Sequence, residues 1–139
     1  MITLEQLKEP EQIRSVMRNK QRSLIALETR LTAVNQPMTG MPGAHGNNKM
    51  EVLMAEYIDR KEELQELQEK LDQTCEALEA DIREETSGDD YTRLILTMHY
   101  LYGLGWERTA AGIGVGYSPD AVRMHVTRWL KGKRPVHEQ

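Results

Sequence analysis

Residues 106–132 read WERTAAGIGVGYSPDAVRMHVTRWLKG and contain the clearest helix signals of the chain. A short helical segment that begins at Trp106 is followed by GVGY, a turn in which Gly114 can adopt a positive φ. Ser118 and Pro119 then form a typical helix start, because serine caps a helix and proline is favoured at its first position. The sequence therefore predicts two short helices joined by a glycine-containing turn, which is the arrangement of a helix-turn-helix.

The second of these helices is expected to end at Gly132 and to have two distinct faces. Its expected core face consists of residues at helical spacing, namely Val122, Val126, Trp129 and Leu130. The candidate DNA contacts on the other face and beyond it are Ser118, Asp120, Arg123, Met124, Thr127, Arg128, Lys131, Lys133 and Arg134. Arg123 lies near the helix start and is the candidate for a bidentate contact to guanine. The later basic residues are expected to contact phosphates, and His125 is expected to flank this face.

Two longer helices are predicted before this region. In residues 11–34 and again in residues 49–86, apolar residues recur every three or four positions in a narrow stripe, with charged residues on the other faces. Such a stripe is typical of a coiled-coil seam. Residues 36–48, QPMTGMPGAHGNN, interrupt the pattern with prolines and glycines and are expected to form a flexible loop. The two helices should therefore form an antiparallel hairpin.

The expected lengths of the two long helices differ. The first would be about 36 Å long and the second about 57 Å, at about 1.5 Å per residue. About 20 Å of apolar seam on the second helix would then have no partner within the hairpin. This mismatch predicts that the seam packs on the C-terminal part or on another chain, and it favours a homodimer formed through the hairpin.

A third helix is expected after Ser87 and Gly88, with Ser87 or Asp89 as its cap and Gly103 at its end. No alternating strand pattern interrupts these helices. We therefore expect an all-α protein of two parts. Residues 1–88 would form the helical hairpin, and residues 89–139 would form a three-helix domain that contains the helix-turn-helix.

The composition narrows the class of protein. The chain has 139 residues, of which 39% are hydrophobic and 29% charged, and no apolar run reaches the length of about 20 residues that a membrane span needs. The N-terminal MITLEQLKEP does not have the layout of a signal peptide, so we expect a cytoplasmic protein. Cys75 is the single cysteine, and the four histidines lack metal-ligand spacing. With no nucleophile–base pair or nucleotide motif, we expect neither an enzyme nor a cofactor or metal.

The net charge of -4 hides a strong asymmetry along the chain. Residues 36–88 carry thirteen acidic and five basic side chains, whereas residues 89–139 carry seven basic and five acidic ones. Because salt confines such fields to about 10 Å, the local balance matters more than the total. The basic C-terminal part fits double-stranded DNA. The acidic helix is expected to be a solvated coiled-coil face, with a docking surface for RNA polymerase or another basic partner as the alternative.

The C-terminal part resembles region 4 of bacterial sigma factors, and more closely the sigma-like regulators of phages and prophages of Gram-positive bacteria. The matching stretches are LTMHYLYGLGWERTAAGIG, residues 96–114, and YSPDAVRMHVTRWL, residues 117–130. In that family a tryptophan opens the first helix of the motif, a small residue follows four positions on, and Ser or Thr starts the recognition helix. Trp106, Ala110 and Ser118 stand at those places. The GVGY turn is longer than is usual in the family.

The resemblance implies a phage or prophage transcriptional regulator that reads duplex promoter DNA. Tyr57 is the only aromatic residue before residue 87 and lies in the apolar seam, so we expect no platform for melted bases and no strand opening. Two alternatives remain open. One is a DNA-recognition subunit of the phage packaging machine, similar to a small terminase. The other is a coiled-coil protein-interaction module that does not bind DNA.

Overall fold

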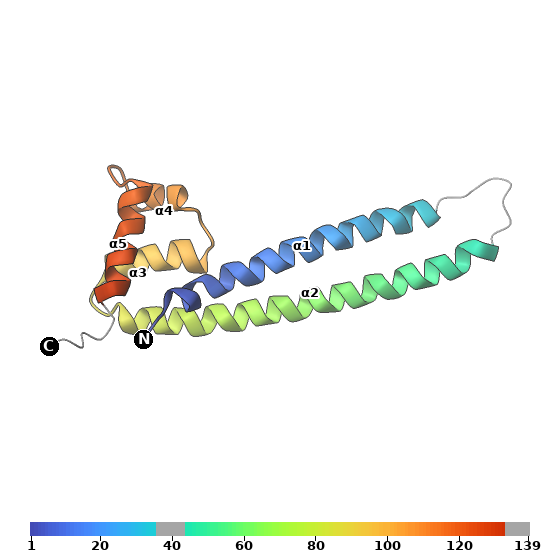
Figure 1. Ribbon diagram of the computed structural model, residues 1–139, viewed down its shortest axis with the longest axis horizontal. Coiled ribbons are helices and arrows are strands. Elements are labelled where there is room, and N and C mark those ends of the chain that lie inside the picture. The colour runs from blue at the N-terminus through green and yellow to red at the C-terminus, as the bar shows by residue number, and fades with distance from the viewer. Residues whose placement is uncertain (36–43, 133–139) are drawn as a thin grey trace. The chain divides into compact units, whose positions relative to one another are not determined.

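The computed structural model describes residues 1–35 and 44–132, with side chains described for residues 1–34 and 49–132 (Figure 1). This part of the chain is helical and contains no strand, which confirms the predicted all-α class. The helices are α1 (Leu4–Asn35), α2 (Ala44–Glu85), α3 (Asp90–Leu96), the π-helical segment η1 (Thr97–Leu101), α4 (Trp106–Ile113) and α5 (Pro119–Gly132). Within the described residues, no helix is long and apolar enough to cross a membrane.

The helices divide between two compact units. The hairpin unit consists of Ile13–Lys70, and the terminal unit combines Met1–Gln12 with the chain from Leu71 onward. The start of α1 and the end of α2 therefore belong with the C-terminal helices. The predicted domain boundary between residues 88 and 89 stays a prediction.

The start of α1 differs from the sequence expectation, because the helix begins at Leu4 and not at residue 11. The Thr3 hydroxyl accepts a hydrogen bond from the Gln6 backbone N–H at 3.2 Å, and the Gln6 side chain accepts one from the Thr3 N–H at 2.9 Å. This reciprocal arrangement is a capping box. Ile2 and Leu7, which flank it, are both buried, as in a hydrophobic staple. The helix continues through Pro10, which is buried inside it.

The longer α1 reduces the length mismatch on which the unpartnered seam was based: α1 has 32 residues and α2 has 42, a difference of about 15 Å. Ile2 and Leu7 belong to one buried cluster with Leu78 and Ile82, which lie near the end of α2. This part of the α2 seam is therefore covered by the chain's own N-terminus. The expectation that the seam packs on the C-terminal part is confirmed, because Ile95 and Leu96 of α3 belong to the same cluster, whereas the homodimer stays a prediction.

In the hairpin unit, α1 and α2 run antiparallel. Lys20 forms an ion pair with Glu63 at 2.6 Å, and the Tyr57 hydroxyl donates to Glu28 at 3.2 Å. From the first pair to the second, the residue number rises on α1 and falls on α2, as it does between antiparallel helices. The buried residues of this unit are Ile13, Met17, Leu27 and Leu53, all members of the predicted stripes. The helix α2 begins at Ala44, earlier than expected, and residues 36–43 of the predicted loop lie outside the described residues.

The end of α2 is closed by a side chain from the next helix. Thr86 is buried, and its hydroxyl donates to the Ile82 carbonyl at 2.5 Å. Arg93 donates to the Thr86 hydroxyl and to the Arg83 carbonyl, both at 3.1 Å. An arginine at this position satisfies carbonyl groups that a helix C-terminus leaves without partners. Arg93 therefore has a structural role, although its charge contributes to the basic C-terminal segment.

Candidate nucleic-acid interface

The first helix of the motif, α4, spans Trp106–Ile113, the range expected from the sequence. The Trp106 ring stacks on the His99 ring, with centroids 3.5 Å apart and planes at 16°. His99 Nδ1 lies 2.6 Å from the Leu104 carbonyl oxygen, and because a carbonyl only accepts, this nitrogen carries the proton. Burial lowers the pKa of His99, which favours the neutral ring. The π-helical segment η1 and Trp106 thus fix the start of α4 together, a contact that sequence reasoning missed.

Small residues in α4 leave room for the neighbouring helices. Thr109 and Ala110 are both buried. A Cβ atom at Gly112 would meet the flexible end of the Met98 side chain of η1, which would have to shift. These positions explain why the WERTAAGI helix is rich in small residues. They allow α4 to pack against both η1 and α5, the contacts that hold the motif together.

The turn between α4 and α5 depends on two glycines. Gly114 has a φ of 148° and Gly116 a φ of 94°, a backbone region that side-chain-bearing residues rarely adopt. Between them Val115 is fully exposed, and Tyr117 after them is partly exposed, with its ring centroid 5.8 Å from that of Tyr91. The positive φ expected for Gly114 is confirmed. Gly116 provides the second left-handed residue that this long turn requires.

The recognition-helix candidate, α5, begins as the sequence predicts. The Ser118 hydroxyl accepts a hydrogen bond from the Ala121 backbone N–H at 3.1 Å, and Pro119 is the first helical residue. The Ser118 hydroxyl is therefore used as a helix cap. The other N–H groups of the first turn point along the helix axis, where an anion such as a phosphate is favoured.

Helix α5 packs through one face only. Val122 and Val126 are buried at 0% and 2% exposure, and the half-buried Trp129 and Leu130 pack against the same cluster. The predicted core face is therefore confirmed. His125 also turns inward, because its Nε2 lies 2.8 Å from the Thr92 hydroxyl and its ring meets the Tyr91 ring edge-on at 4.6 Å. The expectation that His125 flanks the DNA face was wrong.

The contact of His125 belongs to a small polar network at the start of α3. The Thr92 hydroxyl donates to Asp89 at 2.6 Å, and Asp89 also accepts from the Thr92 backbone N–H at 3.1 Å. Because the Thr92 proton is used on Asp89, His125 Nε2 acts as the donor to Thr92. The hydrogen bond from the Thr92 hydroxyl, and to a smaller extent the one from the Thr92 backbone N–H, holds the pKa of Asp89 below its usual value of 3.8. Asp89, one of two predicted caps, thus fixes the start of α3 and the angle of α5.

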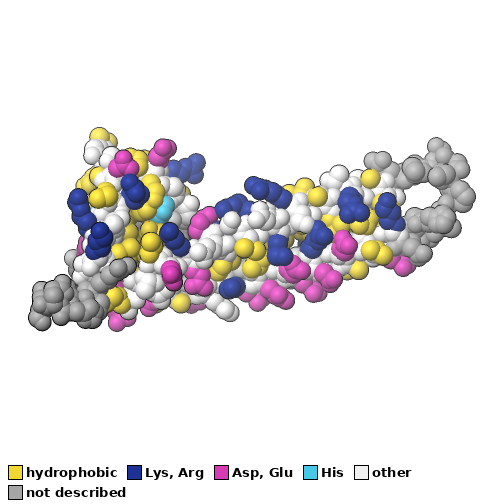
Figure 2. Space-filling view, in the orientation of Figure 1, with side chains coloured by type: hydrophobic (Ala, Val, Ile, Leu, Met, Phe, Trp, Pro, Cys, Tyr) yellow, Lys and Arg dark blue, Asp and Glu magenta, His cyan; other side chains and the backbone are white. Residues whose placement is uncertain are grey.

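The outward face of α5 contains the sequence-predicted contacts. The exposed residues are Ser118, Asp120, Arg123, Met124, Thr127, Arg128 and Lys131. Figure 2 shows Lys and Arg side chains gathered over this helix. Arg123 lies 3.6 Å from Asp120, and both side chains remain largely exposed, at 54% and 89%. Lys133 and Arg134 lie outside the described residues.

The charges on this face favour a polyanion. Three of its side chains are cationic and one is anionic, although the whole chain is acidic. The two arginines are five positions apart, which corresponds to about 7.5 Å along the helix axis. Thr127 donates its hydroxyl to the Arg123 carbonyl at 3.2 Å, which leaves its oxygen as an acceptor. The face therefore offers guanidinium, ammonium and hydroxyl groups on one rigid helix, which is the chemistry that duplex DNA requires.

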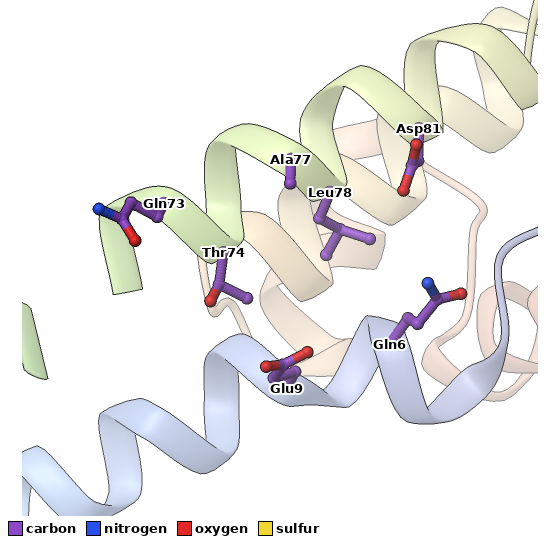
Figure 3. Close-up of a pocket in the computed structure, with 7 residues that line it drawn as sticks. All are labelled: Gln6, Glu9, Gln73, Thr74, Ala77, Leu78 and Asp81. Carbon is purple, nitrogen blue, oxygen red and sulfur yellow. The ribbon is translucent and has the colours of Figure 1, made fainter. Parts of the chain in front are cut away.

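The terminal unit also contains an open depression of about 280 Å³ between the start of α1 and the end of α2 (Figure 3). Its lining residues are Gln6, Glu9, Gln73, Thr74, Ala77, Leu78 and Asp81. Carboxylates and amides around an open depression are typical of a solvated helix surface, so we assign it no role. Within the described residues, no group of three or more His, Cys, Asp or Glu side chains could hold a metal ion.

Comparisons of the chain with the models of known protein families, with curated proteins and with solved structures found no match.

Proposed function

We propose that this protein is a DNA-binding transcriptional regulator of the sigma region-4-like type, and not an enzyme. It would bind duplex promoter DNA through the outward face of α5. One observation carries the proposal. Val122 and Val126 anchor α5 to the core, while Arg123, Arg128 and Lys131 on the same helix are exposed. A helix held in this way can enter the major groove without losing its own packing.

The order of side chains along α5 suggests how the contacts divide. Arg123 lies in the second turn, where recognition helices reach base edges, and its guanidinium can bind guanine O6 and N7 together. Its ion pair with Asp120 is short-range and exposed, so it can exchange for a base contact. Arg128 and Lys131, farther along the helix, would contact phosphates and set the register of the protein on the duplex.

The proposal includes binding without strand opening. Capture of melted bases requires exposed aromatic rings on which the bases stack. Tyr57 is the only aromatic residue before residue 87, and its hydroxyl donates to Glu28 across the helix pair. This placement favours a protein that assists or redirects host RNA polymerase over one that melts promoters.

The test is a selection of binding sites from a random duplex library, followed by affinity measurements on the enriched sequence. Arg123→Ala should lower the preference for the enriched sequence about 10- to 100-fold, because one bidentate contact is lost. Lys131→Ala should weaken all duplexes alike and reduce the slope of log affinity against log salt by about 0.9. With about four phosphate contacts, the wild-type slope should be near -3.6.

Arg83→Ala is the matched control, since it removes one exposed cation from α2 and none from α5. It should leave both the preference and the salt slope unchanged. If the wild-type protein binds no duplex at low salt, the proposal fails and a coiled-coil protein-interaction module becomes the better interpretation. Rings in solution, with sequence-specific binding retained, would instead favour a subunit of a packaging machine.

A further inference from the structure

The two edges of the helix pair in the hairpin unit differ in chemistry. One edge is closed by polar contacts: Lys20 pairs with Glu63 at 2.6 Å, and Arg60 hydrogen-bonds to Ser23 and pairs with Glu56 at 3.7 Å. Such contacts satisfy the polar groups along a coiled-coil seam and keep that edge solvated. Val16 and Val52, each one turn from these polar residues, are also exposed, at 44% and 60%.

The other edge has the Tyr57–Glu28 hydrogen bond and three exposed apolar side chains. Ile25 is 61% exposed, Ile58 51% and Met54 42%. Ile25 lies one turn before Glu28 on α1, while Met54 and Ile58 lie one turn apart on α2 beside Tyr57. Tyr57 donates to Glu28 across the pair, and helical spacing from these two residues places the three side chains on that same side. We call Ile25, Met54 and Ile58 the apolar edge.

The antiparallel register places the two isoleucines at the same height. Ser23 lies opposite Arg60, and Glu28 lies opposite Tyr57. Ile25 is two residues after Ser23, and Ile58 is two residues before Arg60, so they are level across the pair. A two-fold axis parallel to the helices would therefore bring Ile25 of each copy against Ile58 of the other. This is the pattern of a self-complementary interface.

The charges of the two helices support the same arrangement. Residues 13–35 of α1 carry five basic side chains and one acidic, whereas residues 49–70 of α2 carry seven acidic and four basic. Figure 2 shows Lys and Arg mainly over α1 and Asp and Glu mainly over α2 on the face in view. A two-fold parallel to the helices sets α1 of each copy against α2 of the other, so opposite charges meet. A two-fold axis perpendicular to the helices would instead set α1 of one copy against α1 of the other.

We propose that the apolar edge is the contact surface for a second copy of this chain, in an antiparallel four-helix arrangement. The area of this face of the hairpin unit is consistent with a second copy of the chain as the partner. About 23 residues of α1 give about 35 Å of length, and two helices side by side give about 20 Å of width. The resulting area of about 700 Å² per copy is close to the roughly 800 Å² that a stable interface buries on each partner. This surface does not depend on DNA binding, but it would give the particle two α5 helices.

The experiment measures the solution mass of the full chain by sedimentation equilibrium at micromolar concentration. The wild-type protein should have twice the chain mass of 16.0 kDa. Ile25→Glu or Ile58→Glu should raise the dimer dissociation constant about 100-fold, because each change removes two symmetric apolar contacts. Val16→Glu is the matched control: Val16 is 44% exposed on α1 away from the apolar edge, and its variant should stay dimeric. Circular dichroism should show all three variants as helical as the wild type.

A charge-exchange variant tests the register itself. In the proposed arrangement, Ile25→Glu combined with Ile58→Lys in one chain places Glu against Lys at both symmetric contacts, so the dimer should return. A monomeric wild type, dimeric single variants, or a monomeric Val16→Glu would each overturn the proposed surface. A double variant that stays monomeric would overturn the register. Duplex affinity, measured separately, shows whether the proposed DNA function stands or fails independently of this result.

Discussion

Asp120 is the one anionic side chain on the outward face of α5, and its removal should strengthen DNA binding. It lies 3.6 Å from Arg123, with the two side chains 89% and 54% exposed. An exposed pair of this kind is worth about 0.2–1 kcal/mol, and Arg123 gives it up when it binds a base or phosphate. Asp120→Asn removes this competition and the repulsion of nearby phosphates. The affinity for a mixed-sequence duplex should therefore rise about two- to fivefold.

The same substitution should act on stability in the opposite direction. Asp120 lies in the first turn of α5, where a carboxylate interacts favourably with the helix dipole by about 0.3–1 kcal/mol. Denaturant unfolding should thus show a slightly less stable Asp120→Asn protein, while fluorescence anisotropy shows tighter DNA binding at low salt. A gain in affinity that accompanies a loss in stability cannot come from a better-folded protein.

Glu5→Gln is the matched control for Asp120→Asn. Glu5 is exposed and occupies the second helical position of α1, as Asp120 does in α5, so the change in net charge and helix position is the same. This variant should leave duplex affinity nearly unchanged. If Asp120→Asn weakens binding, or if Glu5→Gln strengthens it equally, the reasoning that places DNA on the outward face of α5 is refuted.

Two further substitutions test how α5 is positioned. Asp89→Ala should cost about 1–2 kcal/mol of unfolding free energy, since it removes a helix cap, and Asp89→Asn should cost less. The lowered pKa of Asp89 means that this contribution is present above pH 3.8 and is lost as the pH falls through the lower folded-state value, so wild type and Asp89→Ala should converge in acid. Gly116→Ala should cost about 1–2 kcal/mol because φ is 94°, whereas Gly132→Ala, at the end of α5 without a positive φ and with open space around it, should not destabilise the protein. Equal effects of the two glycine substitutions in thermal unfolding would contradict the backbone argument.

The C-terminal helices could be predicted from the sequence because local signals set their boundaries. Ser118 and Pro119 mark the start of α5 by capping and fixed φ, and Gly114 marks the end of α4 by its positive φ. These signals act within one turn of the chain, so no tertiary information is needed. The apolar spacing of Val122 and Val126 then determines which face of α5 turns inward and which is left for a ligand.

The predictions that failed depended on competition between signals or on distant contacts. Pro10 was expected to precede the first helix, but the capping box of Thr3 and Gln6 starts the helix earlier, and Pro10 lies buried within it. The inward turn of His125 depends on Thr92, thirty-three residues away, and spacing within α5 does not reveal it. The π-helical segment η1 likewise depends on packing around His99, for which the sequence has no local signal.

The central claim is that DNA contacts the outward face of α5, and amide chemical shifts during titration with a duplex measure this most directly. The enriched duplex from the site selection, added at low salt, should shift or broaden the amides of α5 and of the Gly114–Gly116 turn. The amide signals of residues 13–34 and 49–70 in the hairpin unit should keep their chemical shifts. Shifts confined to the hairpin unit, or no shifts at all, would contradict the account.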